Sequence, residues 1–134
     1  MISGLSHITF ITRDLDAFAR IIIEVLGGEE IYDSGDRQFS ISREKFFTVG
    51  DIWIVIMEGD SLPSRSYNHV AFKIDDIGLE KAKAAAEKLG LEIKPSRPRV
   101  VGEGQSLYFY THDNHLIELH TGTLEQRLAH YTRG

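Results

Sequence analysis

Two histidines and one glutamate occupy matching positions in an internal repeat of this chain. Residues 6–10 (SHITF) resemble residues 68–72 (NHVAF), which begin 62 positions later. Both segments alternate as a half-buried strand does. Glu118 lies 49 positions after His69, and Ile56 lies 49 positions after His7. The repeat therefore predicts four equivalent inward positions, filled by His7, Ile56, His69 and Glu118.

These residue types could hold a catalytic divalent metal. Two imidazoles and one carboxylate leave coordination positions open for water or substrate. A single histidine in a strand is usually structural or exposed, but two at the same repeat position together with Glu118 favour a metal site. Glutamate is rarely buried without a partner, so Glu118 beside apolar neighbours needs a cation. His120 has the same strand parity as Glu118, and we expect it to lie behind the ligands or at the surface.

The elements that would position these residues form two βαβββ halves of an α+β fold. In the first half, strand patterns cover residues 5–11, 30–32, 38–49 (with a turn around residues 43–45) and 52–57, and a helix runs from Asp14 to Gly27. In the second half, strand patterns cover residues 67–74, 91–94, 107–110 and 116–120, and helices cover residues 78–89 and 123–131. Leu124 and Leu128 mark the expected buried side of the last helix. We predict one domain of residues 1–134, with modules at about residues 1–60 and 67–134 joined by a turn-rich linker.

Composition excludes several classes of function. The chain has 134 residues, 42% hydrophobic and 26% charged, which is ordinary for a soluble domain. Its net charge of -5 and its lack of a basic cluster argue against nucleic acid as a partner. Without cysteine there can be no disulfide, cysteine nucleophile or thiolate metal site. No apolar run could span a membrane and no signal peptide is visible, so we expect a cytoplasmic protein that acts on a small molecule.

Longer motifs resemble a known family. The paired βαβββ halves with two histidines and a glutamate are similar to the vicinal-oxygen-chelate superfamily and, within it, to the fosfomycin resistance proteins, most closely their hydrolase branch. The resemblance covers nearly the whole chain. The segments that carry it are residues 4–9, 44–47, 53–62, 67–72, 98–110, 113–120 and 122–128.

The resemblance implies a reaction. Such proteins inactivate fosfomycin, a small epoxide that bears a phosphonate, and the hydrolase branch adds water at the carbon bonded to phosphorus to give a diol. It implies that His7, His69 and Glu118 bind Mn(II), which acts as a Lewis acid, and that Glu44 is the general base. From composition alone, the segment around Glu44 would be a charged hairpin turn.

The resemblance also implies substrate contacts and a partner subunit. The implied substrate-binding residues are Thr9, Arg99, Ser106, Tyr108 and Arg127. Arg127 would bind the phosphonate through its guanidinium fork. Proteins of this family are homodimers with exchanged modules, in which His7 of one subunit joins His69 and Glu118 of the other.

Other functions are compatible with the same residues. A metal-dependent S-transferase would add glutathione or bacillithiol at the same site, and an extradiol dioxygenase would use Fe(II) and a catechol. A drug-binding protein of the bleomycin-sequestering kind would not need the ligands. A glyoxalase-type isomerase usually fills the fourth ligand position, and Ile56 argues against it.

Overall fold

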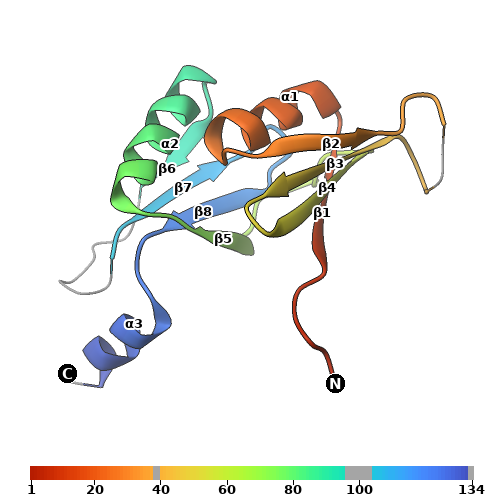
Figure 1. The fold of residues 1–134 in the computed structure, drawn as a ribbon. Coiled ribbons are helices and arrows are strands. Elements are labelled where there is room, and N and C mark those ends of the chain that lie inside the picture. The colour runs from red at the N-terminus through yellow and green to blue at the C-terminus, as the bar shows by residue number, and fades with distance from the viewer. Residues whose placement is uncertain (38–39, 96–103, 133–134) are drawn as a thin grey trace. The chain divides into compact units, whose positions relative to one another are not determined.

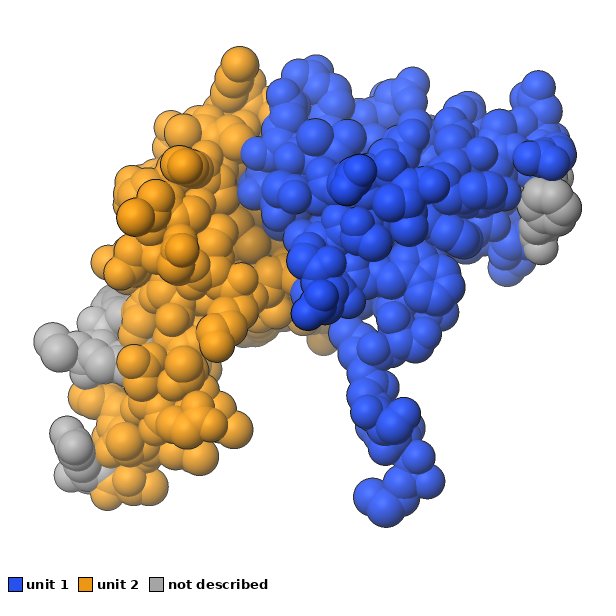
Figure 2. All heavy atoms as spheres, in the orientation of Figure 1, with its two compact units in different colours: residues 1–65, 111–115 blue, residues 66–110, 116–134 orange. Residues whose placement is uncertain are grey.

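The chain divides into two compact units, and each is described by itself (Figures 1 and 2). The computed structural model describes residues 1–37, 40–95 and 104–132. Unit 1 contains residues 1–65 and 111–115, and unit 2 contains residues 66–110 and 116–134. Residues 111–115 therefore group with unit 1, although they lie in the second half of the sequence. No described helix is long and apolar enough to cross a membrane.

Unit 1 is a four-stranded mixed sheet with one helical segment. Its strands are β1 (His7–Thr12), β2 (Glu29–Asp33), β3 (Glu44–Val49) and β4 (Ile52–Glu58), in the order β1-β4-β3-β2. β1 runs parallel to β4, and the other pairs are antiparallel. Helix α1 (Leu15–Arg20) begins at Asp14, whose carboxylate accepts the Ala17 N–H, and continues as the π-helical η1 (Ile21–Val25). Phe10 stacks on Phe18 of α1, so one face of this sheet is the core.

Unit 2 repeats the plan. Its strands are β5 (His69–Lys73), β6 (Glu92–Lys94), β7 (Ser106–Tyr110) and β8 (Leu116–His120), in the order β5-β8-β7-β6. Helix α2 (Asp76–Lys88) packs Leu79, Ala82 and Ala86 into the core. The core face of the sheet consists of Phe72, Leu107, Phe109, Ile117 and Leu119, all buried. Helix α3 (Leu124–Tyr131) follows β8 and begins with a capping box between Thr123 and Gln126.

The predicted α+β class and the βαβββ order of both halves are confirmed. The predicted turn at residues 43–45 is wrong, because Glu44 and Lys45 belong to β3 and pair with Met57 and Ile56 of β4. A strand can hold Glu44 and Lys45 because successive side chains point to opposite faces of the sheet. Lys45 meets carboxylates on the core side, and Glu44 lies on the other face. The buried side expected for α3 is also absent within its described chain, since Leu124 and Leu128 are exposed.

The strand register corrects one position of the repeat. In unit 2, Ala71 pairs with Glu118, whereas Thr9 at the matching position of unit 1 pairs with Val55. Ile56 pairs with Phe10 on the core face and is fully buried. The prediction that Ile56 is the counterpart of Glu118 is therefore wrong by one residue, because the repeat offset grows by one before the last strand. Val55 holds that position, and it is apolar too.

Candidate functional site

One face of the unit 2 sheet gathers most of the predicted site residues. Partners in adjacent strands point to the same side, so Ser106 opposite His120 and Tyr108 opposite Glu118 share the face that α2 does not cover. His69 and Arg127 flank this face from β5 and α3. A cavity of about 300 Å³ lies here, lined by His69, Ala71, Glu118, His120, Gly122, Thr123, Leu124 and Arg127.

Glu118 and His69 present two electron-pair donors to each other. His69 Nε2 lies 3.0 Å from Glu118 Oε1, and His69 Nδ1 lies 2.7 Å from the Tyr67 carbonyl oxygen. That carbonyl can only accept, so Nδ1 carries the proton and a neutral ring leaves Nε2 as an acceptor. A proton on Nε2 or a metal ion can bridge two acceptors at this distance, and adjacent ligand atoms at about 2.1 Å from an octahedral metal lie about 3 Å apart. The pair therefore fits a divalent metal.

The second oxygen of Glu118 is held from behind. Ser106 Oγ donates to Glu118 Oε2 at 2.7 Å and lies 2.7 Å from His120 Nδ1. His120 Nε2 in turn lies 3.4 Å from Arg127 Nη2. Glu118 is only 5% exposed, so these contacts decide which way its carboxylate faces. The sequence predicted only that His120 would lie behind the ligands or at the surface, from its shared strand parity with Glu118. It did not predict the contacts of His120 with Ser106 and Arg127.

Tyr108 lies on the same face, opposite Glu118 and toward the β6 end of the sheet. Burial, a hydrogen bond with Tyr67 and the adjacent charge of Glu118 all raise the pKa of Tyr108. Its hydroxyl therefore stays protonated at neutral pH and remains able to donate. Lys94 Nζ lies 5.2 Å from the centre of the Tyr67 ring, which brings a positive charge to this end of the sheet.

Unit 1 carries the other predicted site residues on a single face. His7 pairs with Trp53, Thr9 with Val55, and Glu44 with Met57, so His7, Thr9 and Glu44 share the face opposite α1. The ring centres of His7 and Trp53 are 4.4 Å apart. Met57 follows Trp53 by four residues, roughly 13 Å along the strand. Unit 1 therefore aligns Glu44 with His7 but does not bring them into contact.

The Glu44 carboxylate is buried without a partner among the described residues. Glu44 is 7% exposed, and its only hydrogen bonds there involve its backbone, which pairs with Ser34 and Met57. Most buried carboxylates are hydrogen-bonded or paired, so an exception is a candidate for a functional group. No hydrogen bond or ion pair within the described part of unit 1 gives this carboxylate a structural role.

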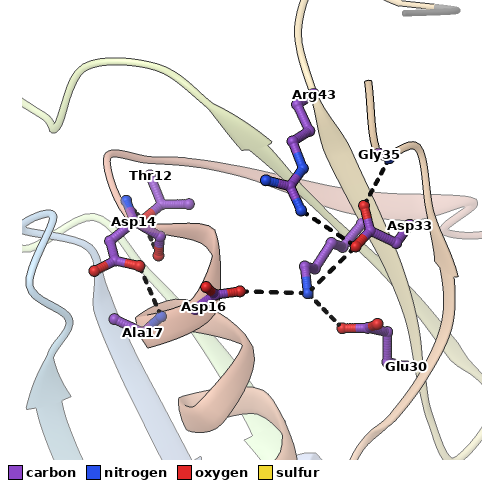
Figure 3. A network of polar contacts seen from close by, with 9 residues as sticks. Thr12, Asp14, Asp16, Ala17, Glu30, Asp33, Gly35 and Arg43 are labelled. Atoms are coloured by element: carbon purple, nitrogen blue, oxygen red, sulfur yellow. Dashed lines mark hydrogen bonds and ion pairs between the residues drawn. The ribbon is translucent and has the colours of Figure 1, made fainter. Parts of the chain in front are cut away.

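Lys45 shows the opposite arrangement on the other side of the strand. Its ammonium lies 3.0 Å from Glu30, 3.6 Å from Asp16 and 3.7 Å from Asp33 (Figure 3). Burial lowers the pKa of Lys45, but the hydrogen bond to Glu30 and the neighbouring carboxylates outweigh it, so the pKa is raised. Alternation thus separates adjacent charged residues into a paired lysine on the core side and an unpaired glutamate on the open side.

The described units do not by themselves complete a metal site. Within residues 1–37, 40–95 and 104–132, no three His, Asp or Glu side chains form a metal-binding cluster. Unit 2 brings together His69, Ser106, Tyr108, Glu118 and Arg127, and unit 1 holds His7, Thr9 and Glu44. Arg99 lies outside the described residues.

Comparison with known proteins places this site in a family. Residues 4–119 match the Glyoxalase/Bleomycin resistance protein/Dioxygenase superfamily. A fosfomycin resistance protein FosX from Mesorhizobium japonicum is 57% identical over 134 residues, which is all of this chain and 96% of that protein. The chain belongs to this superfamily and, within it, to the FosX proteins.

Two further relatives are a FosX structure with bound ligands and a thiol transferase. A crystal structure of a FosX mutant from Listeria monocytogenes, complexed with Mn(II) and 1S,2S-dihydroxypropylphosphonic acid, is 53% identical with a TM-score of 0.88, and the match covers 98% of this chain and 99% of that one. A metallothiol transferase FosB from Shouchella clausii is 32% identical over 99% of this chain and 90% of its own length. The relatives of this chain therefore include a metallothiol transferase.

Proposed function

We propose that this protein inactivates fosfomycin by adding water to its epoxide, with Mn(II) as cofactor. The full-length match to FosX proteins supports the substrate, and the Mn(II) in the Listeria relative supports the metal. The ligand in that relative is a three-carbon phosphonate with two hydroxyl groups, which is the skeleton that water addition to fosfomycin would give. A phosphonate diol of this kind fits hydrolysis better than thiol addition.

His69 and Glu118 would hold the metal in this proposal, with His7 as the third ligand. The fit rests on the acceptor pair of His69 Nε2 and Glu118 Oε1, which lie 3.0 Å apart. Bound there, the ion supplies Lewis acidity toward the oxygen of the opening epoxide. The Tyr67 carbonyl orients His69 by fixing its proton on Nδ1, as partners of metal-binding histidines commonly do.

Glu44 would be the general base, and its buried, unpartnered carboxylate is the observation that carries the hydrolase proposal. Water is a poor nucleophile, so it must lose a proton as its oxygen bonds to carbon. In this step Glu44 takes that proton, the new C–O bond forms, and the carbon–oxygen bond of the ring breaks. The ring oxygen keeps the electron pair of the broken bond and takes up a proton to become the second hydroxyl of the diol. A thiol transferase uses a thiol as its nucleophile, so it does not need a general base that deprotonates water.

Several side chains would bind the phosphonate in this proposal. Arg127 lines the 300 Å³ cavity with His69 and Glu118, and its guanidinium suits an anion with several oxygens. Tyr108 offers a hydroxyl that stays protonated, and Thr9 lies on the same sheet face as His7. Ser106 already donates to Glu118, so we assign it to the metal side of the site. The role of Arg99 stays a prediction.

A homodimer with His7 supplied by a second subunit belongs to the same proposal. The exposed apolar side chains Leu124, Leu128 and Tyr131 of α3 support a further contact surface, since an amphipathic helix gains stability by covering such residues. Multi-angle light scattering should give twice the monomer mass. Mixed dimers of His7→Ala and Glu118→Ala subunits should regain activity in one of their two sites. The cytoplasmic location stays a prediction from the sequence.

The test is phosphorus NMR of fosfomycin with metal-free protein and added Mn(II). One tube contains no thiol, and parallel tubes contain glutathione or bacillithiol. We expect the diol signal without thiol, its loss in Glu44→Gln, and its persistence in Glu58→Gln, which changes an exposed glutamate at the end of β4. Both substitutions remove one carboxylate charge, so Glu58→Gln controls for charge.

Each alternative function gives a different experimental result. A product that forms only with thiol would make the protein an S-transferase, as the FosB relative would suggest, and Glu44 would then be structural. An unchanged fosfomycin signal in every tube would overturn both activities. Oxygen uptake with Fe(II) and a catechol would instead indicate a dioxygenase.

A further inference from the structure

We propose that His120 is a positioning residue that holds the phosphonate-binding arginine and the metal-binding glutamate in one hydrogen-bonded line. The proposal rests on the function proposed above and deepens it. His120 is the last residue of β8, and its side chain is 16% exposed. It stands between Arg127 on one side and Ser106 with Glu118 on the other.

The direction of the line follows from what each group can donate. A guanidinium has only donors, so His120 Nε2 accepts from Arg127 Nη2 at 3.4 Å. The neutral imidazole then carries its proton on Nδ1, which donates to Ser106 Oγ at 2.7 Å. Ser106 has one hydroxyl hydrogen, and it is free to donate to Glu118 Oε2 at 2.7 Å. All three hydrogen bonds therefore point from Arg127 toward Glu118.

The opposite tautomer would break the line at both ends. A proton on Nε2 would face the Arg127 donor, and an unprotonated Nδ1 would compete with Glu118 for the single Ser106 hydrogen. His120 Nδ1 also lies 3.5 Å from Glu118 Oε2, so its N–H adds a favourable field at that oxygen. Arg127 thus selects the ring form that lets Ser106 serve the carboxylate.

The consequence for the metal is an oriented carboxylate. With Oε2 held by Ser106, Glu118 turns Oε1 toward His69 Nε2. Groups behind metal ligands typically change metal affinity by about 10–100-fold when they are removed. The consequence for the substrate is a guanidinium held at the cavity wall before the anion arrives, which lowers the ordering cost of binding.

Three substitutions of His120 separate its contact with Arg127 from its contact with Ser106. His120→Ala removes both contacts. His120→Asn keeps a short side-chain N–H that can replace Nδ1 toward Ser106 but does not reach Arg127. His120→Gln places an amide oxygen near the former Nε2 and can accept from Arg127 but lacks the donor to Ser106. His112→Ala is the matched control, because His112 is an exposed histidine in the turn before β8.

The first readout is the Mn(II) dissociation constant of the metal-free protein, measured by electron paramagnetic resonance without substrate. We expect a rise of about 10–100-fold in His120→Ala and His120→Gln, and recovery to near the wild-type value in His120→Asn. The second readout is the KM for fosfomycin at saturating Mn(II). We expect a rise of about tenfold in His120→Ala and His120→Asn, and a smaller one in His120→Gln.

The outcomes separate this inference from the function on which it rests. Unchanged Mn(II) affinity and KM in His120→Ala, or the same losses in the Asn and Gln variants, would overturn the positioning role while hydrolysis by the wild type stands. Failure of the wild type to bind Mn(II) would instead overturn the proposed metal site. Thermal unfolding of each metal-free variant confirms that the compared proteins are folded, and the Asn variant remains informative if His120→Ala is not.

Discussion

Each unit has a buried glutamate on its open sheet face, and the surroundings of the two glutamates differ. Glu118 in unit 2 is 5% exposed and contacts His69, Ser106 and His120. Glu44 in unit 1 is 7% exposed, and its carboxylate has no partner among the described residues. A carboxylate with fixed hydrogen bonds is suited to hold a metal in one orientation. A carboxylate without them keeps its oxygens available to take a proton.

Strand register makes this comparison direct. Glu44 pairs with Met57 and Ser106 pairs with His120, so Glu44 and Ser106 occupy equivalent positions of the two sheets. Val55 and Glu118 are equivalent in the same way. Unit 2 places Glu118 at one position and the Ser106 hydroxyl that donates to it at the other, whereas unit 1 places Val55 and the carboxylate of Glu44 there. In the proposed function, the same backbone plan would serve metal binding in one copy and proton transfer in the other.

The largest expected effect comes from exchanging the two carboxylates for amides. Glu118→Gln should weaken Mn(II) binding by more than about 100-fold, because it removes a ligand charge. Glu44→Gln should leave Mn(II) affinity within about twofold and lower the hydrolysis rate by about 10²–10⁴-fold, the usual contribution of a general base. Mn(II) titration and phosphorus NMR on both variants check this. Equal loss of Mn(II) affinity in both variants would remove the distinction between the two carboxylates.

Removing the metal should affect stability through the ligands of unit 2. A ligand that binds only the folded state at about 100 times its Kd stabilises it by about 2.7 kcal/mol. We expect Mn(II) to raise the melting temperature of the wild type and of Glu44→Gln, and to have little effect on His69→Ala. Differential scanning fluorimetry with and without chelator measures this. A full Mn(II) shift in His69→Ala would exclude His69 as a ligand.

The sequence predicted the fold and the closeness of His69 to Glu118 because both depend on periodicity. Alternation in residues 6–10 and 68–72 set the strands, and the same residue types at the same repeat position indicated His69 with Glu118. Ile56 was assigned one residue off, because an extra residue before the last strand cannot be located from a repeat that is only partly conserved between the halves. Register, which comes from hydrogen bonding between strands, resolved it.

Local sequence patterns could not predict contacts between segments that are far apart in the chain. The segment at residues 43–45 has the composition of a turn, but Lys45 pairs with β4 and β2 in the sheet, and its ammonium meets carboxylates of α1 and β2. The line through His120 likewise needs α3 to bring Arg127 back to the end of β8. Parity alone placed His120 near Glu118 but could not supply its partners.

A smaller effect is expected for Lys45, which lies next to Glu44 but faces the core side. Lys45→Met removes the charge that pairs with Glu30, Asp33 and Asp16, and should lower the free energy of unfolding by about 1–3 kcal/mol, discounted because those carboxylates are partly exposed. Its raised pKa means that this stabilisation is complete below about pH 10 and is lost above it. Urea unfolding of Lys45→Met beside the exposed Lys88→Met tests this. Unchanged Mn(II) affinity would confine the effect to unit 1.

The smallest expected effect concerns Asp113, in the turn between β7 and β8 that belongs to unit 1. Burial would raise the pKa of Asp113, but hydrogen bonds from Ser61, Thr12 and the Arg13 N–H outweigh it and lower the pKa. A carboxyl whose pKa is lowered by folding stabilises the fold above its ordinary value, about 3.8, and loses that contribution as pH falls through the folded value.

Asp113→Asn should therefore lower the free energy of unfolding by about 1–2 kcal/mol at neutral pH, since an amide offers one acceptor where the carboxylate offers two. The difference from the wild type should be smaller at about pH 2 than at neutral pH, because the charge of Asp113 is lost as the pH falls through its lowered pKa. Urea unfolding at both pH values measures it, with the exposed Asp51→Asn as control. A difference of the same size at both pH values would mean that the turn is held by shape and not by the charge of Asp113, and the link between this second-half turn and unit 1 would then be steric.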